Sequence, residues 1–186
     1  MFADSQFDGD VSEWDVSRVV DMGGIFLKTM FNGDISEWDV SNVVSMNHMF
    51  AESYFDRDVS EWDVSKVCDM SKMFYDTPFN GDVSQWDVSN VTDMHGMFAE
   101  SPFNGDVSEW NVSNVVDMSA MFFNCEFNGD VSEWDVSSVT NMKGMFAGSQ
   151  FDGNIEDWDV SNVTDKSLMF KESRLERIGR IPLWYY

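Results

Sequence analysis

Several kinds of residue or segment are scarce in this sequence, and each scarcity excludes a class of protein. Only two of its 186 residues are cysteine, three are proline and 11 are lysine or arginine. Two cysteines cannot build the disulfide framework of a small secreted domain. Cys68 and Cys125 also occupy different positions of the repeat described below, so they are not expected to pair. No run of about 18 apolar residues predicts a membrane span, and no signal peptide is recognisable.

Acidic and aromatic residues are abundant instead. Asp and Glu number 34, the formal net charge at pH 7 is −23, and aromatic residues make up 15% of the chain. This aromatic content indicates a packed protein, because disordered acidic chains contain few aromatic residues. The charge opposes binding to nucleic acid or to an anionic membrane, and it favours a basic partner or cations. The last 21 residues differ, since they hold five of the 11 basic residues.

A 24-residue repeat occupies almost the whole sequence. Trp and Phe each recur seven times at constant intervals of 24 residues, and no insertion interrupts the period. The repeat reads Phe-Asn-Gly-Asp-Val-Ser-Glu-Trp-Asp-Val-Ser-Asn-Val-Thr-Asp-Met-x-x-Met-Phe, followed by a variable link. A fixed period of roughly 20–29 residues is typical of a solenoid with one chain turn per repeat. Stacking of these turns predicts a core ladder of tryptophans: Trp14, Trp38, Trp62, Trp86, Trp110, Trp134 and Trp158.

Each repeat predicts one strand and one short helical segment. The Asn/Asp-Gly pair is a turn signal, since glycine takes positive φ freely. Trp14 and Val16 are two residues apart, which places them on one face of a strand and Glu13 and Asp15 on the other. The apolar residues of 19–26 are spaced three, three and one apart, which favours one side of a short helix or 3-10 segment.

The repeat resembles the BspA-like bacterial surface-protein repeat family, first described as a mycoplasma lipoprotein-associated repeat of unknown function. The resemblance covers essentially all of residues 1–170. The end of the chain, Ser173 to Glu176 followed by Pro182 to Tyr185, is similar to a divergent form of that family's ending, with Arg174 in place of a proline. The resemblance implies a distant leucine-rich-repeat relationship, a role in adhesion, a location at the cell surface or outside the cell, and no catalytic residues.

We therefore expect a repeat solenoid. It would be a right-handed parallel stack resembling a leucine-rich repeat, with seven turns that each hold one short β-strand and one short helix or 3-10 segment. Val19 and its equivalents stand where a leucine-rich repeat has a buried Asn, so a straight parallel β-solenoid is the alternative architecture. The expected parts are a partial repeat over 1–6, seven repeats over 7–170 and a C-terminal cap over 171–186.

The first residues lie inside a repeat. Met1 to Ser5 align with Met49 to Ser53, and no polar N-terminal cap precedes them. Solenoid ends require such caps. We expect the chain to be a fragment of a longer array, or to associate with another molecule through this end.

No group of residues predicts catalysis. His48 and His95 occupy different positions of the repeat and lack a Cys or His partner at ligand spacing, so they are interpreted as surface or edge histidines. The repeated serines, such as Ser17, have no accompanying base. The protein is therefore predicted not to be an enzyme, and no cofactor is expected.

One column of carboxylates leaves two interpretations open. Stacked at about 5 Å, like charges repel, so these side chains either cap backbone amides as Asx turns or share cations. Calcium is the weaker alternative, because the calcium-binding nonapeptide of β-rolls is absent. The column, continued by Asn154, is Asp10, Asp34, Asp58, Asp82, Asp106 and Asp130.

A second set of carboxylates predicts a binding surface. Twelve of them share the outer face of the predicted strand, where partners of a solenoid usually bind. Gln85 and Asn111 are the two uncharged members of these columns. We call this set the acidic face: Glu13, Asp15, Glu37, Asp39, Glu61, Asp63, Asp87, Glu109, Glu133, Asp135, Asp157 and Asp159.

The expected function is that of a non-catalytic protein- or glycan-binding module of a surface or secreted protein, with the acidic face as contact surface and a basic partner. A solvated face that merely aids solubility is the simpler interpretation of the same residues. A calcium-dependent structural or adhesive array is the alternative function. An ice-binding array ranks low, because only Thr92, Thr140 and Thr164 share a column.

Overall fold

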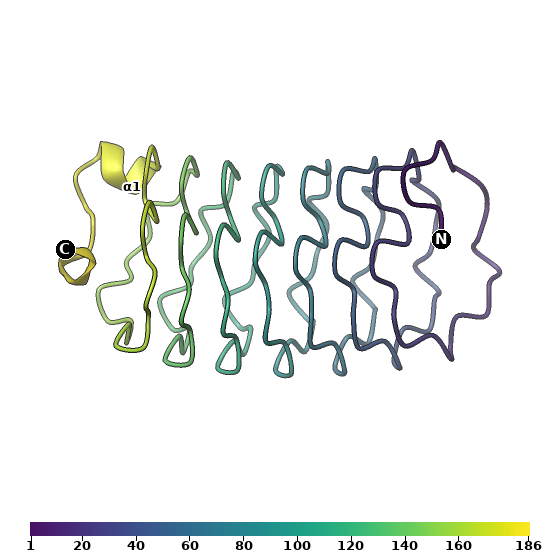
Figure 1. The fold of residues 1–186 in the computed structure, drawn as a ribbon, viewed down its shortest axis with the longest axis horizontal. Coiled ribbons are helices and arrows are strands. Elements are labelled where there is room, and N and C mark those ends of the chain that lie inside the picture. The colour runs from purple at the N-terminus through teal and green to yellow at the C-terminus, as the bar shows by residue number, and fades with distance from the viewer.

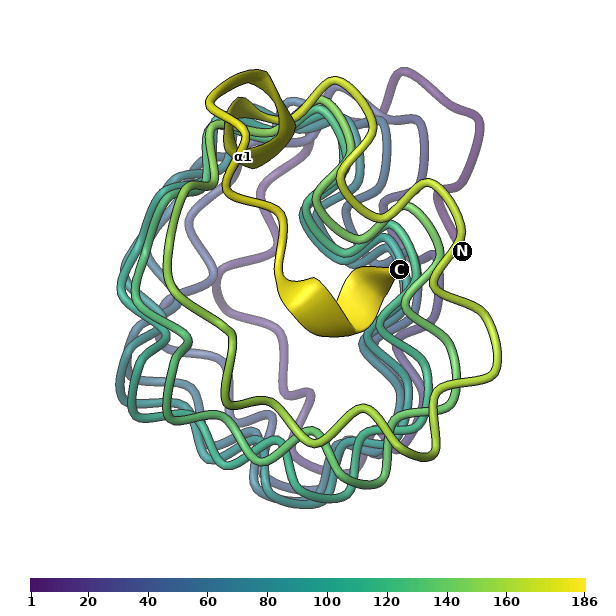
Figure 2. The ribbon, with the colours of Figure 1, turned by 90° about the vertical axis from the view of Figure 1, so that its left-hand side faces the viewer.

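The computed structural model describes all 186 residues as a stack of chain turns. The turns lie side by side along one axis with the termini at opposite ends (Figure 1), and they overlie one another when viewed along it (Figure 2). Isolated parallel bridges join residues 24 apart, from Asp21 and Ser45 at one end to Asn141 and Asp165 at the other. The two regular elements are the helix α1 (Arg174–Arg177) and the 3-10 helix η1 (Leu183–Tyr185). Each repeat thus makes one turn of the stack.

Backbone amides on one side of each turn alternate between two kinds of partner. The amides of His48 and Phe50 donate to the carbonyls of Ser71 and Met73 in the next turn, at 2.8 and 3.0 Å. The amide of Met49, which lies between them in the sequence, donates back to the carbonyl of Met46 within the same turn at 3.1 Å. One set of bonds joins successive turns and the other closes β-turns within each turn. No continuous helix or strand can arise from this alternation.

The short helix expected over residues 19–26 and their equivalents is therefore not present. Backbone φ is positive at His48 (53°) and Glu52 (54°), and this left-handed conformation cannot continue a right-handed helix. His48 is the third residue of a β-turn closed by the amide of Met49 and the carbonyl of Met46 at 3.1 Å. A positive φ at this position is typical of a type II turn. The three-residue spacing of apolar side chains comes from consecutive turns.

The strand expected at residues 11–17 is also replaced by turns. The amide of Trp14 donates to the carbonyl of Val11 at 3.1 Å, and that of Val19 to Val16 at 2.8 Å. These local bonds use the amides that a strand would direct at its neighbours. The link to the next turn is made by a side chain instead, since the indole Nε1 of Trp38 donates to the carbonyl of Val11 at 3.1 Å. The alternation of inward apolar and outward acidic side chains is nevertheless that of the predicted strand.

Aromatic ladders run through the interior. Within one turn, the rings of Phe50 and Phe55 stack with centroids 3.8 Å apart, and the ring of Phe74 in the next turn lies 5.7 Å from Phe50. Trp86 is 4% exposed, and its Nε1 donates to the carbonyl of Val59 at 3.0 Å. Six of the seven repeat tryptophans make this bond to the preceding turn. Buried area and ring stacking therefore join the turns together.

The C-terminal residues make the contacts that a further repeat turn would make with the last one. Leu175 stands at the position of the repeat phenylalanine, and its amide donates to the carbonyl of Phe151 at 3.0 Å. Trp184 of η1 donates from Nε1 to the carbonyl of Ile155 at 2.9 Å, the bond that a repeat tryptophan would make. Lys166 replaces a methionine, and its Nζ donates to the carbonyl of Trp184. Figure 2 shows η1 lying across the end of the stack.

The first turn lacks such a neighbour. Trp14 is 43% exposed, whereas the other repeat tryptophans are 4–5% exposed. Its indole Nε1 makes no hydrogen bond, because no earlier turn supplies a carbonyl. The ladder predicted from the sequence is therefore incompletely covered at Trp14.

The two cysteines do not form a disulfide. Cys68 and Cys125 are both free thiols. Cys125 is buried, its Sγ donates to the carbonyl of Phe103 at 3.1 Å, and burial raises the pKa of its thiol to about 11. None of the helices has the length and hydropathy needed to traverse a membrane.

Candidate functional site

All twelve carboxylates of the acidic face are exposed. They project from the two β-turns that replace the predicted strand, with one or two carboxylates from each turn of the stack. The side chains form two lines along the stack and do not converge on one point. Such a surface can contact an extended partner, whereas a single reaction centre would require groups of different kinds at one place.

The first line, which we call the Asp15 column, is tied to the backbone. Oδ1 of Asp15 accepts a hydrogen bond from the amide of Ser17 at 3.1 Å and one from its hydroxyl at 2.6 Å. The hydroxyl and the amide of Ser17 together lower the pKa of Asp15. Asn111 makes the same two bonds with Ser113, so an amide oxygen serves as well as a carboxylate. These residues shape the turn and leave one carboxylate oxygen free.

The second line has no structural partner. The six carboxylates of this line, which we call the Glu13 column, make no hydrogen bond or ion pair with any other residue of the chain. The seventh member, Gln85, is uncharged, and its amide donates to the hydroxyl of Ser84 at 3.3 Å. The column consists of Glu13, Glu37, Glu61, Gln85, Glu109, Glu133 and Asp157.

The Asp10 column caps backbone amides. Oδ1 of Asp34, for example, accepts from the amide of Ser36 at 3.1 Å and from its hydroxyl at 2.9 Å. That amide and hydroxyl lower the pKa of Asp34. All six carboxylates and Asn154 accept the amide two residues ahead. No group of three or more His, Cys, Asp or Glu side chains is placed to hold a metal ion.

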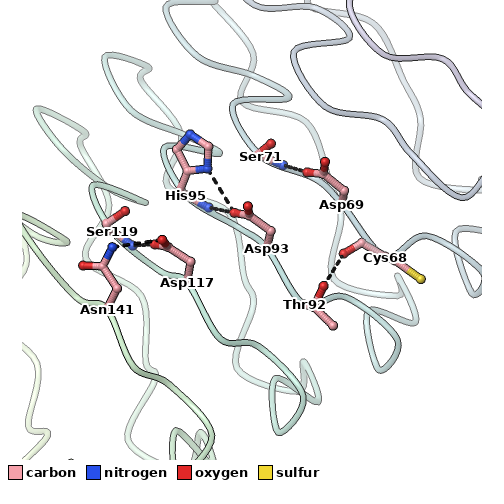
Figure 3. A network of polar contacts seen from close by, with 9 residues as sticks. All are labelled: Cys68, Asp69, Ser71, Thr92, Asp93, His95, Asp117, Ser119 and Asn141. Carbon is pink, nitrogen blue, oxygen red and sulfur yellow. Dashed lines mark hydrogen bonds and ion pairs between the residues drawn. The ribbon is translucent and has the colours of Figure 1, made fainter. Parts of the chain in front are cut away.

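A third line of capping carboxylates was missed in the sequence analysis. Asp69, Asp93 and Asp117 accept the amides of the residues two positions ahead at 2.8–2.9 Å (Figure 3). They lie at the bridges between turns and are partly buried. The same spacing, an aspartate followed two residues later by an amide donor, marks the Asp10 and Asp15 columns. It was overlooked because these aspartates lie in the segment where a short helix is expected from the sequence.

One histidine, His95, contacts an aspartate of this third line. Nδ1 of His95 lies 3.0 Å from Oδ1 of Asp93, and that contact raises the pKa of His95. Burial would raise the pKa of Asp93, but its contacts with His95 outweigh burial and lower it. Burial lowers the pKa of His48, and the nearby charge of Lys72 adds to the effect. Figure 3 shows the thiol of Cys68 directed away from the His95–Asp93 pair.

The acidic face is hollowed where its first two turns meet. A hollow of about 520 Å³ is lined by Trp14, Glu13, Asp15, Asp34 and Glu37, with Ser12 and Ile35. The exposed indole of Trp14 lies among these carboxylates. An aromatic ring beside carboxylates suits an ammonium or guanidinium group.

Comparison with known proteins identifies a family for the chain. The model of the family described as "Mycoplasma protein of unknown function, DUF285" matches residues 1–104 and again residues 99–177. No curated protein and no solved structure matches. The two matches together span all seven repeat tryptophans and the three lines of capping residues. The chain therefore belongs to this Mycoplasma protein family of unknown function.

Proposed function

We propose that the protein is a non-catalytic binding or adhesion module whose acidic face binds a basic protein surface. In this proposal the stack is a solenoid related to leucine-rich repeats and belongs to a surface or secreted protein. The resemblance of the repeat to BspA-like surface proteins supports that setting. The family description itself assigns no function.

The observation that carries the proposal is the unpartnered Glu13 column. A carboxylate that serves folding is expected to accept hydrogen bonds, as those of the Asp15 column do. The Glu13 column accepts none, although it places a fixed acidic side chain on nearly every turn. Stacked turns lie about 4.8 Å apart, and lysines on one face of a helix lie about 5–6 Å apart. A basic helix can therefore pair with successive turns.

The small free energy of a single exposed ion pair indicates how the acidic face would bind a partner. An exposed ion pair contributes only about 0.2–1 kcal/mol, so several must form together to give useful affinity. Charges of one sign also accelerate the encounter with an oppositely charged partner. We expect a partner with a row of basic residues.

The test uses a substitution that removes charge and keeps the turns. Replacing Glu37 and Glu61 by Gln, and Asp39 and Asp63 by Asn, leaves the amide caps in place, as Asn111 shows. The probe is a 20-residue helical peptide with Lys at every third or fourth position, measured by calorimetry at low salt. We expect the variant to bind it at least about tenfold more weakly, since about four exposed ion pairs are lost.

A matched control removes the same charge elsewhere. Glu52, Asp76, Glu100 and Glu126 are exposed on another side of the stack, and their replacement by Gln or Asn also removes four negative charges. This control should bind the peptide nearly as well as the original chain. Equal losses in both variants would show that only net charge matters and would refute the proposed face.

A further inference from the structure

A second concave surface lies away from the acidic face, on the side of the stack built by the type II turns. It is a hollow of about 350 Å³ between the fifth and seventh turns. Its walls are half apolar, although the protein as a whole is strongly acidic. The residues that define it are Ala120, Phe123, Lys143, Ala147, Leu168 and Lys171.

The hollow arises from an alternation of large and small side chains along one column. Leu27, Tyr75, Phe123 and Lys171 alternate with Ala51, Ala99 and Ala147 in successive turns. Each alanine is buried at the floor between two larger neighbours. Ala147 is therefore flanked by Phe123 on one side and Lys171 on the other.

The equivalent position two turns earlier already holds an aliphatic chain. A β-carbon placed on Gly96 would lie 3.1 Å from Cγ and 3.7 Å from Cε of Lys72, so the stem of Lys72 rests there. Its ammonium lies 5.7 Å from the centre of the Tyr75 ring. A β-carbon placed on Gly144, two turns further on, would meet no atom within 4 Å. The methylene groups of Lys72 thus fill the hollow beside Gly96, whereas the equivalent hollow beside Gly144 is open.

Leu168 is placed at the rim of the open hollow at a cost to the fold. Its φ is +60°, in the left-handed region that disfavours residues with a β-carbon. Its side chain is also 52% exposed. The same position is glycine at Gly24, Gly96 and Gly144, and the non-glycine residues His48, Lys72 and Ala120 also have positive φ there. The left-handed conformation therefore belongs to the repeat, and what distinguishes the seventh turn is the large, exposed apolar side chain of Leu168 beside the hollow.

Two lysines give the hollow its charge preference. Lys143 stands where Ser71 and Ser119 stand in other turns, and it makes no ion pair within the chain. Lys171 stands where the other repeats have leucine, alanine or an aromatic residue, and its only ion pair is an exposed one with Glu172 at 3.8 Å. Both ammonium groups can therefore turn toward an anion bound at the hollow.

We propose that this hollow binds a small organic carboxylate with an aromatic or aliphatic body. The body rests on Ala147 between Phe123 and Leu168, and Lys143 and Lys171 hold the carboxylate. The volume of about 350 Å³ lies at the lower end of the range for small-molecule sites, about 300–1,000 Å³. The site is separate from the acidic face and does not depend on the function proposed for it.

The test compares three probes that share one body: 4-phenylbutyrate, the uncharged 4-phenylbutanamide and 4-phenylbutylammonium. Each is titrated into the ¹⁵N-labelled full chain, and amide shifts are followed. We expect 4-phenylbutyrate to shift Gly144 and Ala147, with an affinity about tenfold above that of the amide at low salt. The cation should not shift these residues. Shifts that are absent, or equal for all three probes, would overturn the proposal.

Two variants test the apolar wall and the two lysines of the site separately. Leu168→Gly removes one apolar wall and relieves the left-handed strain, so binding should weaken about fivefold while the melting temperature stays the same or rises. Lys143→Ser with Lys171→Ala should abolish the preference for the carboxylate over the amide. The control pair Arg57→Gly and Lys66→Asn removes two positive charges from the third turn and should keep that preference. Unchanged binding by Leu168→Gly, or equal effects of the two charge pairs, would refute the site.

Discussion

At the scale of single residues, aspartate performs one task at three positions of most repeats. In the Asp10 column, the Asp15 column and the third line, to which Asp21 also belongs, it accepts the amide two residues ahead, and so closes an Asx turn. This explains why carboxylates can stack in lines despite their mutual repulsion. Each line is held by local hydrogen bonds to charged groups, which are stronger than those to neutral ones. The glutamates next to them have no such task, which is why we assign binding to them.

The capping aspartates predict a pH dependence of stability. Hydrogen bonds from Ser41 and Ser65 lower the pKa of Asp39 and Asp63 below their ordinary value of 3.8. A lowered folded-state pKa stabilises the fold above the unfolded-state value, and this contribution is lost as pH falls through the folded-state value. Asn keeps the cap and does not titrate. Between pH 5 and pH 2, the melting temperature of Asp39→Asn with Asp63→Asn should therefore fall less than that of the original chain. Parallel curves would show that the titration of Asp39 and Asp63 contributes nothing to the pH dependence of stability.

At the scale of the element, the repeating unit of the fold is one turn of the stack. A single turn cannot bury its apolar side chains without its neighbours. Its backbone bonds run to the next turn at His48 and Phe50, while its indoles bond to the preceding turn on the opposite side. Each turn is therefore joined to its neighbours by backbone on one side and by side chains on the other. Stability in such stacks is approximately a sum over turns and their interfaces.

A central tryptophan tests this linkage. Trp86→Ala should lower the free energy of unfolding by about 3–5 kcal/mol, because it empties a buried site. Trp86→Phe keeps most of the packing and loses the bond to the Val59 carbonyl, so it should cost about 1 kcal/mol for that bond. Gln85→Ala, one residue away on the outer side, should change stability by less than about 0.5 kcal/mol. Urea denaturation of the three variants measures this, and similar losses for Trp86→Ala and Gln85→Ala would contradict the assignment of faces.

The 24-residue period was predictable from the sequence, but the local backbone conformation was not. The period of 24 and the inward side chains could be read from Trp and Phe spacing, because stacking forces equivalent residues into columns. Turns could not be told from a strand and a helix, because β-turns at Val11 and Val16 produce the same alternation of faces as a strand. The left-handed residues were also hidden, since His48, Glu52 and Leu168 are not glycine. The third line of aspartates was missed because it lies in the segment where a helix was expected, whereas the exposed acidic face followed directly from alternation.

At the scale of the whole molecule, charge is divided between sides and ends. The acidic face lies along the stack, and the basic residues gather toward the C-terminal end, where Lys166 and Arg174 also stabilise contacts with the last turn. The hollow proposed to bind a carboxylate lies near this end, apart from the acidic face.

Metal removal distinguishes the binding module from a calcium-dependent array. Capping amides already occupy one oxygen of each carboxylate in the Asp10 column. We expect the melting temperature in millimolar calcium and in chelator to agree within about 2 °C at matched ionic strength, since a ligand that binds the folded state specifically would shift it further. Magnesium at the same concentration is the control for general screening. A large shift specific to calcium would favour the calcium-dependent array.

The central claim is that the acidic face is the contact surface, and the salt dependence of the association rate tests it most directly. Stopped-flow association with the Lys-bearing helical peptide should slow as salt rises from about 20 to 300 mM, because screening weakens steering. The variant of Glu37, Asp39, Glu61 and Asp63 should lose most of that dependence, and the control variant of Glu52, Asp76, Glu100 and Glu126 should keep it. An identical salt dependence in both variants would contradict the account.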